Sequence, residues 1–393
     1  MDKSNIYISM PRGVNFGWGV CGIELSLGLA EMARVSYITD PFTPDDIGDP
    51  DQHKRLSSLF LSKETLPACP GEQDLMCLEH PILQAIEGKT LRPLYMKVKA
   101  PRVIGYTFFE TPFLNPEHVA RANDYYDRIV AGSTWCQGVL EDQGIRNAST
   151  VIQGVDPSLF HQKDIQERTD FKDKFVVFSG GKLELRKGQD LVIRAFKVLQ
   201  DRHDDVLLLN SWYNLWDQSL MTMRFSPYIT FDMPKGDYYQ AVNRLMLANG
   251  IDPDRVVTLP PLPHAQMPEI YRNTDCGLFP NRCEGGTNLV LMEYMACGKP
   301  AIASFSSGHK DVLTGTNSLP VMSMKKFTMK NNAGNIVEQW DDPSLEEIVE
   351  NLEWAYLHRD ALKKIGQKSA LSMSGHTWNK VAESFYDFLM KDD

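Results

Sequence analysis

Short runs of apolar residues alternate with longer amphipathic segments from one end of the chain to the other. In the first half, these runs predict four buried β-strands, at Ile6–Met10, Val35–Thr39, Val103–Phe108 and Ile129–Ala131. In the second half they predict five more, at Phe175–Phe178, Val206–Leu209, Val256–Leu259, Gly277–Phe279 and Ala301–Ser304. Between strands, residues 188–200 place Leu191, Ala195 and Val198 on one stripe, as an amphipathic helix does. The alternation predicts α/β domains built on parallel, doubly wound sheets.

A mostly polar stretch, residues 161–173, separates the two halves and then gives way to the apolar run FVVF. A length of 393 residues suits two or three domains. We therefore predict a first domain over residues 1–165 and a second over residues 166–375. The segment from Pro41 to about Pro101 has weak periodicity, and we interpret it as an irregular insertion or a helical excursion on the first domain.

Composition narrows the class of protein. With 42% hydrophobic and 23% charged residues the chain can build globular cores, and its net charge of −10 argues against coating nucleic acid. No apolar stretch is long enough to span a bilayer or to form a signal peptide, so we expect no membrane span and a cytoplasmic location, with peripheral membrane association left open. The seven cysteines contain no C-x-x-C pair, which predicts neither a disulfide framework nor a zinc site, and we expect reduced thiols.

A glycine pattern lies near the N-terminus. Residues 17–22, GWGVCG, match G-x-G-x-x-G, and Asp40 lies 18 residues after Gly22. Alone, this is the fingerprint of a dinucleotide-binding domain, and it favours an NAD-dependent oxidoreductase. That fingerprint needs its first glycine in the turn directly after the strand, whereas here residues 11–16 intervene.

A looser interpretation of these glycines is a loop that leads into a helix over residues 22–33. Backbone N–H groups of Gly17 and Gly19 at a helix start would suit a phosphate or a sugar hydroxyl. Close packing of helix against strand explains the same glycines equally well, and we favour packing for Gly22.

Two loops in the second half carry stronger signals. Lys182, Arg186 and Lys187 crowd the segment after the strand at 175–178, where open α/β sheets place ligands and where cations offset phosphate charge. A solvated basic loop is the alternative.

The second loop, residues 280–288, precedes a predicted helix over 289–297. Gly285 and Gly286 leave backbone amides accessible at the helix start, which suits an anion. Glu293 lies inside the helix among apolar residues, so it needs a partner, either ligand hydroxyls or an internal cation.

Together, GGKLELRKGQDLVI (residues 180–193) and NRCEGGTNLVLMEYMACGKPAIAS (residues 281–304) resemble the donor half of retaining glycosyltransferases of family 4. The resemblance extends to residues 129–133 and 153–156. It implies the GT-B fold, in which two Rossmann-like parallel-sheet domains face each other across a cleft, and it implies that the C-terminal helix, residues 376–393, packs back on the first, acceptor-side domain.

The resemblance also assigns residues. Lys182 and Lys187 would lie on the donor diphosphate, Glu284 would face the donor sugar, and these three are the predicted catalytic residues. Glu293 would bind the nucleotide ribose. The predicted donor-binding set is Gly17, Gly19, Gly181, Lys182, Arg186, Lys187, Glu284, Gly285, Gly286, Thr287, Asn288 and Glu293. Trp18 and Glu110 are predicted to contact the acceptor or the sugar.

The sequence departs from the family pattern at two points that affect these residue assignments. Lys182 stands where the family usually has Arg, so a bidentate contact is lost. Eight residues, Gly285 to Met292, separate Glu284 from Glu293, where the usual motif has seven, which puts the position of Glu284 in question.

The resulting hypothesis is a retaining glycosyltransferase that moves a hexose from GDP-mannose or a UDP-hexose to a hydroxyl of a glycan, glycolipid or glycoprotein. We expect no cofactor beyond the sugar nucleotide and no metal, because the basic loop and the helix start can neutralise a diphosphate; Asp252-Pro253-Asp254 is interpreted as a helix cap. The NAD-dependent oxidoreductase and a non-catalytic nucleotide-sugar-binding protein stay as alternatives, and a homodimer is left open.

Overall fold

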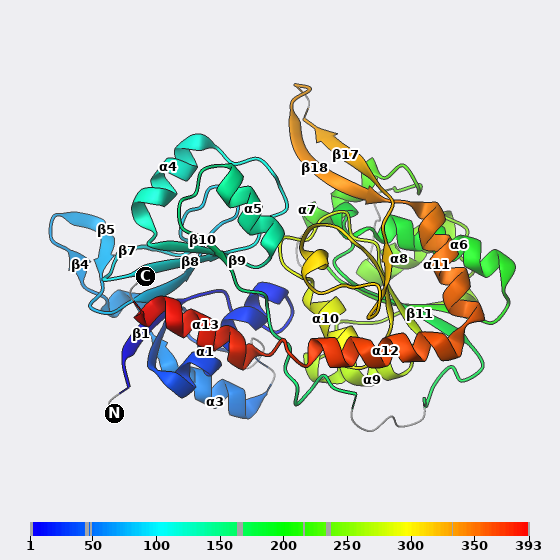
Figure 1. Ribbon diagram of the computed structural model, residues 1–393, viewed down its shortest axis with the longest axis horizontal. Helices are drawn as coiled ribbons and strands as arrows, with labels where there is room; N and C mark the ends of the chain where they lie inside the picture. The colour runs from blue at the N-terminus through cyan, green and yellow to red at the C-terminus, as the bar shows by residue number, and fades with distance from the viewer. Residues whose placement is uncertain are drawn as a thin grey trace. The chain divides into compact units, whose positions relative to one another are not determined.

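The computed structural model describes residues 3–43, 47, 49–162, 168–214, 217–232, 237–331 and 333–391. The chain divides into two compact units, Met1–Gly154 with His376–Asp393 and Val155–Gly375. The boundary predicted between residues 165 and 166 lies outside the described residues. Figure 1 labels many of the helices and strands of both units.

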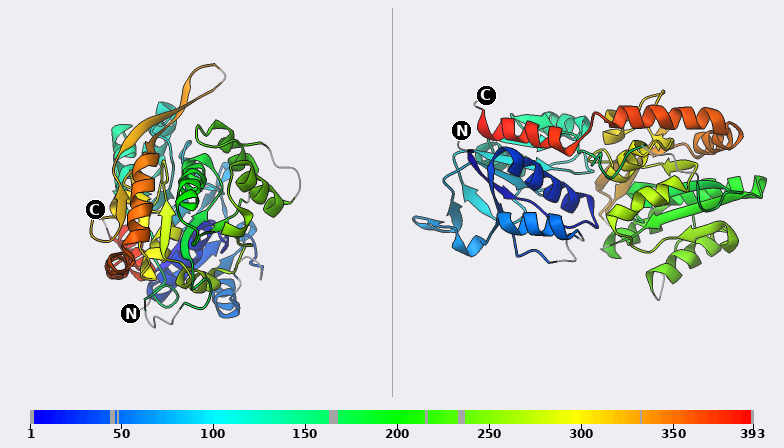
Figure 2. Two further views of the ribbon diagram at one scale, coloured as in Figure 1. Left: turned by 90° about the vertical axis from the view of Figure 1, so that its right-hand side faces the viewer. Right: turned by 90° about the horizontal axis from the view of Figure 1, so that it is seen from below.

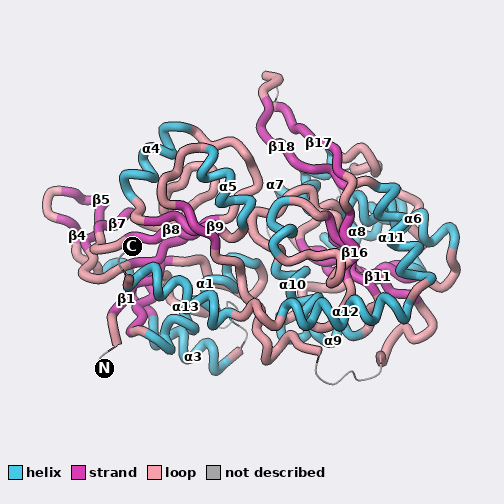
Figure 3. Tube along the Cα trace, viewed as in Figure 1, coloured by secondary structure: helices cyan, strands magenta, loops and turns pink. Residues whose placement is uncertain are grey.

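The first unit is built on a parallel sheet in the order β10-β9-β8-β6-β1-β2-β3. Its strands are β1 (Asn5–Ser9), β2 (Arg34–Ile38), β3 (Phe60–Leu61), β6 (Ile82–Ala85), β8 (Val103–Thr107), β9 (Arg128–Ala131) and β10 (Ala148–Thr150). The interior strand β8 is buried along its whole length, because both faces of a parallel sheet are covered by helices. Figure 3 separates these strands from the helices around them.

The helices of this unit are α1 (Gly17–Met32), α3 (Pro50–Leu59), α4 (Pro116–Tyr125), α5 (Thr134–Asp142) and α13 (Trp378–Met390). Local sequence explains their starts: Asn115 caps α4 by accepting from the N–H of Glu117 at 2.8 Å, and proline occupies the first turn. The C-terminal helix α13 packs against α1 (Figure 2, right), so closely that a Cβ at Gly28 would lie 2.8 Å from Ala382 Cβ.

The interpretation of residues 41–101 as an irregular insertion or a helical excursion is wrong for part of the segment: the helix α3 lies in it, but so do strands of two sheets. Within it, β6 lies between β1 and β8 in the middle of the sheet. A second, three-stranded sheet in the order β4-β5-β7 also forms there, from Ala68–Cys69, Glu72–Cys77 and Lys97–Lys99. The sequence does not reveal β6, because its four residues, ILQA, form a short run interrupted by a polar residue. That residue, Gln84, is buried, and its side-chain amide donates to the carbonyl of Met96 at 3.0 Å.

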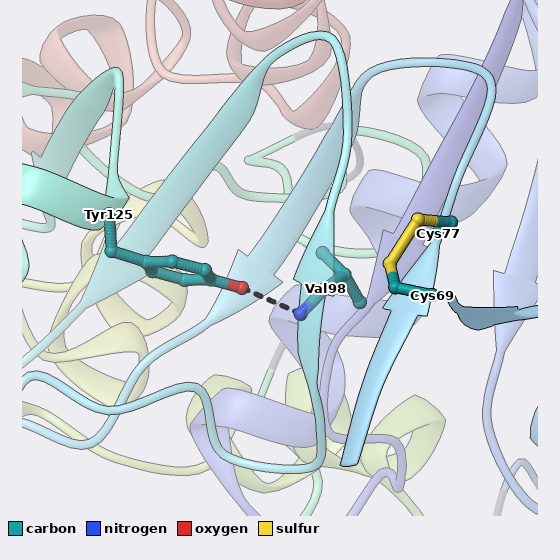
Figure 4. The surroundings of a disulfide bond; sticks show 4 residues. All are labelled: Cys69, Cys77, Val98 and Tyr125. Atoms are coloured by element: carbon teal, nitrogen blue, oxygen red, sulfur yellow. Dashed lines mark hydrogen bonds between the residues drawn. A yellow bond between two sulfur atoms is a disulfide. The ribbon is translucent and has the colours of Figure 1, made fainter. Parts of the chain in front are cut away.

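The expectation that all cysteines are reduced is also wrong. Cys69 and Cys77 form a disulfide in the three-stranded sheet, with their Cα atoms 5.0 Å apart (Figure 4). Strands β4 and β5 are antiparallel, and the turn between them, with Gly71 at φ 83°, folds the chain back so that the two thiols meet. A disulfide formed between paired strands needs no C-x-x-C pair in the sequence, so the absence of such a pair did not exclude it. The other five cysteines are not part of a disulfide.

The second unit contains a parallel sheet in the order β13-β12-β11-β14-β15-β16. Its strands are β11 (Phe175–Gly181), β12 (Val206–Trp212), β13 (Val256–Thr258), β14 (Cys276–Phe279), β15 (Ala301–Ser304) and β16 (Leu319–Val321). Its helices are α6 (Gln189–Arg202), α7 (Asp217–Leu220), α8 (Tyr238–Ala248), α9 (Met267–Arg272), α10 (Leu289–Ala296), α11 (Leu345–Leu357) and α12 (Arg359–Met373). Both units thus have the parallel α/β architecture that the alternation predicts.

An antiparallel hairpin interrupts this pattern after β16. Its strands, β17 (Met324–Lys330) and β18 (Ile336–Pro343), extend away from the six-stranded sheet (Figures 1 and 2). Halfway along it Phe327 stacks on Trp340, with ring centroids 6.1 Å apart. The sequence pattern did not reveal this hairpin.

Candidate functional site

Three loops meet at the carboxyl edge of the six-stranded sheet, because the strands that precede them are neighbours. Residues 182–188 follow β11, residues 280–288 follow β14, and residues 305–311 follow β15. The middle loop is deeply covered, and the side chains of Arg282 and Glu284 are among its buried groups. This edge is where open α/β sheets bind ligands.

An ion-pair cluster joins the first two loops. Lys187 Nζ donates to Glu284 Oε1 across 2.6 Å, and Arg186 Nη1 lies 3.3 Å from Glu284 Oε2. Arg186 also donates through Nη2 to Glu184 Oε1 at 2.5 Å and through Nη1 to the carbonyl of Cys283 at 3.0 Å. Among the described residues, Glu284 is the only hydrogen-bond partner of the Lys187 ammonium, which has further N–H donors to offer an anion.

Glu284 is held as a carboxylate in a fixed place. Burial alone raises its pKa, but the charges of Lys187 and Arg186 outweigh burial and lower the pKa to about 2. Its backbone is anchored to the third loop, where Ser307 Oγ accepts from the Glu284 N–H at 2.8 Å and Gly308 N–H donates to the Glu284 carbonyl at 3.0 Å. Such a carboxylate can accept hydrogen bonds from ligand hydroxyls.

Arg282, in this loop, is not among the site residues predicted from the sequence. Its fully buried guanidinium forms a two-bond contact with Asp190 at 2.8 Å and 2.8 Å, and its Nε donates to Asp342 at 2.7 Å. Burial alone lowers the pKa of Arg282, but Asp190 and Asp342 outweigh burial and raise it. Its Nη1 also donates to the carbonyl of Leu185 at 2.5 Å. Arg282 therefore ties the basic loop, the start of α6 and the base of the hairpin together.

Glu293 lies on α10, and its carboxylate contacts a side chain of the same unit. His264 Nε2 lies 2.8 Å from Glu293 Oε1, and the His264 ring packs on Phe160 with centroids 5.0 Å apart. Among the described residues no hydrogen bond to Glu293 Oε2 is found, which leaves that oxygen to accept from a ligand. The sequence left open whether a ligand or an internal group would satisfy this carboxylate, and the structure supplies one partner for one oxygen.

The predicted glycine loop leads directly into α10. Gly286 and Gly308 are in such close contact that a Cβ at Gly308 would lie 1.7 Å from the Gly286 carbonyl oxygen, while Gly285 is buried beside them. Thr287 Oγ1 donates to Met292 Sδ at 2.9 Å. Asn288 precedes the helix in the left-handed region, with φ 63°, which is uncommon for a residue other than glycine.

Two further predicted donor residues stand at the entrance to the basic loop. Gly181 ends β11 with φ 111°, a conformation that favours glycine, and its carbonyl accepts from the N–H of Tyr213 at 3.3 Å. Lys182 follows it and is partly exposed. The structure thus gathers Arg186, Lys187 and Glu284 into one cluster, with Lys182 on the same loop.

The predicted site residues of the first unit lie apart from this cluster in sequence and belong to a separate unit. Gly17 and Gly19 fall inside the first turn of α1, which begins five residues before the predicted helix start at Gly22. A Cβ at Gly19 would lie 2.2 Å from the Gly13 carbonyl oxygen, so close packing requires this glycine. The separation of α1 from β1 does not fit the dinucleotide fingerprint.

Trp18 and Glu110 both lie near the carboxyl end of β8. The half-buried Trp18 ring meets Phe108 edge-on at 5.5 Å, and Phe108 directly follows β8. Glu110 comes two residues later and is half-buried.

The D-x-D sequence caps a helix. Asp252 Oδ1 accepts from the N–H of Asp254 at 3.0 Å, at the start of the short helix η4 (Pro253–Arg255), as predicted. In the described part of the chain no group of three or more His, Cys, Asp or Glu residues is arranged to hold a metal ion. No helix within the described ranges is long and apolar enough to cross a membrane.

Comparison with known proteins identifies the family. Residues 161–368, just over half of the chain, match the sequence profile of the glycosyl transferases group 1, and the chain belongs to that family. No curated protein sequence gives a match.

Solved structures share the fold along the whole chain. HepE of Anabaena, crystallised with UDP and glucose, has 14% identity, a TM-score of 0.64 and coverage of 98% of this chain and 99% of its own. Sucrose-phosphate synthase of Thermosynechococcus elongatus has 14% identity, a TM-score of 0.64 and coverage of 98% of each chain. A glycosyltransferase of Rickettsia africae has 13% identity, a TM-score of 0.67 and full coverage of both chains. These likenesses and the family match confirm the predicted GT-B glycosyltransferase fold.

Proposed function

We propose that the protein is a retaining, metal-independent hexosyltransferase of family 4 that uses a nucleotide diphosphate sugar. The observation that carries the proposal is the cluster in which Lys187 and Arg186 meet Glu284 at the carboxyl edge of the second sheet. It combines cations suited to a diphosphate with a carboxylate suited to sugar hydroxyls.

The donor would bind along the second unit. Lys187, with N–H donors to spare, and Arg186 would neutralise the diphosphate, with Lys182 and Gly181 at the entrance of the same loop. Glu284 and the loop from Gly285 to Asn288 would take the hexose, and the second oxygen of Glu293 would take the ribose hydroxyls. This assignment gives each polar group of the cluster a complementary ligand group.

Catalysis would come from stabilising the charge that develops on the leaving diphosphate. Lys187 and Arg186 are already fixed by their contacts with Glu284, so they need little reorganisation as the bond to the sugar breaks. The family resemblance implies front-side displacement, in which the leaving phosphate takes the acceptor proton, and no side chain is nominated as nucleophile. Because these cations can carry the diphosphate charge, the proposal needs no metal.

The acceptor, a hydroxyl of a glycan, glycolipid or glycoprotein, is assigned to the first unit, where Trp18 and Glu110 stand near the end of β8. For the donor we propose GDP-mannose or a UDP-hexose. The UDP and glucose found with HepE are a reason to include UDP-glucose first. We also propose a cytoplasmic location, with or without peripheral membrane attachment, and leave a homodimer open. The Cys69–Cys77 disulfide calls for a direct test of the location, because disulfides are rare in a reducing cytosol.

The test is a turnover assay with UDP-glucose, GDP-mannose and other α-linked donors, followed by NMR of the product anomer and repeated in excess EDTA. An α-linked product formed with EDTA present is expected. A β-linked product would refute the retaining assignment, and activity that only Mg²⁺ or Mn²⁺ restores would refute metal independence. Donor binding without transfer or hydrolysis would indicate the non-catalytic binding protein.

A further inference from the structure

His309 links the loop after β15 to the loop before α10. It lies on the short helix η6 (Ser307–Asp311), and its side chain is completely buried. On one side its Nδ1 is 3.1 Å from the carbonyl oxygen of Ser304, and on the other its Nε2 is 3.3 Å from Asn288 Nδ2. The ring therefore bridges the end of β15 and the residue that directly precedes α10.

The contacts of the ring define which nitrogen carries the proton. Ser304 Oγ also lies 3.4 Å from Nδ1, but its hydroxyl already donates to the carbonyl of Asn281, so it acts as an acceptor there. A carbonyl oxygen can only accept, so the proton lies on Nδ1, and Nε2 is left as an acceptor for the Asn288 amide. The neutral ring is consistent with its surroundings: burial lowers the pKa of His309 to about 4, with Lys187 and Arg186 acting in the same direction and Glu284 acting against them. A charged ring would turn an N–H toward the N–H of Asn288.

The contact with His309 determines which polar atom of the Asn288 side chain is available to a ligand. With Nδ2 directed to His309, the amide oxygen Oδ1 is the remaining polar atom of the side chain, and no partner for it is found among the described residues. Asn288 holds a left-handed backbone between Glu284 and α10, in the segment that is one residue longer than the family pattern. A second left-handed residue, Ser307 at φ 43°, lies two residues before His309. Such conformations persist where surrounding contacts enforce them.

Building on the proposed function, we propose that His309 is a positioning residue of the donor site. By accepting from Asn288 Nδ2 it holds the amide oxygen of Asn288 ready to accept a hydrogen bond from a hydroxyl of the transferred hexose. His309 does not touch the donor; it acts through Asn288. The nucleotide and diphosphate contacts do not depend on it.

Two isosteric variants separate this role from general support of the fold. His309→Asn places an amide N–H near the Nδ1 position and keeps the bond to Ser304, but it loses the acceptor for Asn288. His309→Gln places a carbonyl oxygen near the Nε2 position and keeps that acceptor. The measurements are KM and kcat for each donor that the wild type uses, the Kd for free UDP and GDP, and the melting temperature.

We expect His309→Asn to raise the donor KM about tenfold, as the loss of one hydrogen bond does, while the Kd for the free nucleotide stays unchanged. His309→Gln should stay within about threefold of the wild type, because it retains the acceptor. Asn288→Ala should match His309→Asn, and the double variant should lose no more than either, since both remove the same contact.

Equal losses in the Asn and Gln variants, or a parallel loss of free-nucleotide affinity, would overturn the role of His309 and leave the glycosyltransferase proposal standing. If His309→Asn does not fold, the comparison of Asn288→Ala with His309→Gln decides in the same way. A wild type that binds no sugar nucleotide would overturn the proposed function and, with it, this inference.

Discussion

Lys187 and Glu284, 97 positions apart in the sequence, form an ion pair 2.6 Å long between the loops after β11 and β14. Each is the residue that the family resemblance assigns to donor binding, the lysine to the diphosphate and the glutamate to the sugar. Each holds the other in place. A bound diphosphate would approach a lysine that is already oriented.

Lys187→Ala should therefore reduce transfer by tens-fold or more, since one charge-assisted contact contributes roughly 1.5–3 kcal/mol. The free energy of unfolding should also decrease by about 1–3 kcal/mol, because buried Glu284 keeps only Arg186 as its cation. Steady-state kinetics and thermal melts measure the two effects separately.

Lys326→Ala is the matched control. Lys326 lies exposed on the hairpin, where it pairs with Asp341 at 2.6 Å, and its removal should change neither turnover nor stability measurably. If Lys187→Ala behaved like this control, the loop would be an ordinary basic turn.

All nine strands predicted from the sequence form, because their apolar runs are local signals. Ala301–Ser304 matches the predicted limits, and Phe175–Gly181 runs three residues past the predicted end because Ser-Gly-Gly carries no apolar signal. The predicted helix at 289–297 agrees with α10 to within one residue.

The features that the sequence did not predict depend on contacts between segments that are distant in the chain. Arg282 looks like one more polar loop residue until Asp342, 60 positions away, appears beside it. The Cys69–Cys77 bridge depends on strand pairing, and the tautomer of His309 depends on Ser304 and Asn288 together. Local patterns reveal the elements and the charged loops, whereas the partners of buried polar groups require the fold.

Glu293→Gln separates ligand binding from internal support. The amide keeps the shape, and His264, whose side chain is 25% exposed, can turn to solvent, so the melting temperature should change little. Affinity for the nucleotide should fall by roughly ten- to a hundredfold, as charged hydrogen bonds to ribose are lost. Calorimetric titration and a melt of the same sample measure both.

Glu350→Gln, an exposed position on α11, serves as the control for that substitution. Should Glu293→Gln melt many degrees lower while its nucleotide affinity is retained, Glu293 would be a structural residue, and the donor site would rest on the basic loop.

The disulfide should contribute to stability without affecting donor binding. It closes a separation of eight residues, for which the loss of chain entropy in the unfolded state corresponds to about 2.5 kcal/mol. The double variant Cys69→Ser, Cys77→Ser should therefore unfold at lower urea concentration and keep its nucleotide Kd, because the proposed donor residues of the basic and glycine loops lie in the other unit. Thiol titration of the denatured wild type should find five free cysteines; seven would show that the bridge does not form.

The buried neutral histidine predicts how stability depends on pH. The pKa of His309 falls from 6.5 to about 4 on folding, chiefly because burial disfavours the charged ring. Between these values the unfolded chain binds a proton that the native chain excludes, so the free energy of unfolding must decrease as the pH falls from 6.5 toward 4, by roughly 3 kcal/mol in total.

The lowered pKa of Glu284 adds a separate loss of stability between pH 4.5 and about 2, because its carboxylate is paired with Lys187 and Arg186 only when folded. His309→Gln removes the first component and leaves the second. Urea unfolding at a series of pH values from 7 to 4.5 should therefore give a steeper decline for the wild type than for His309→Gln. Parallel curves would show that His309 is not held neutral by the fold.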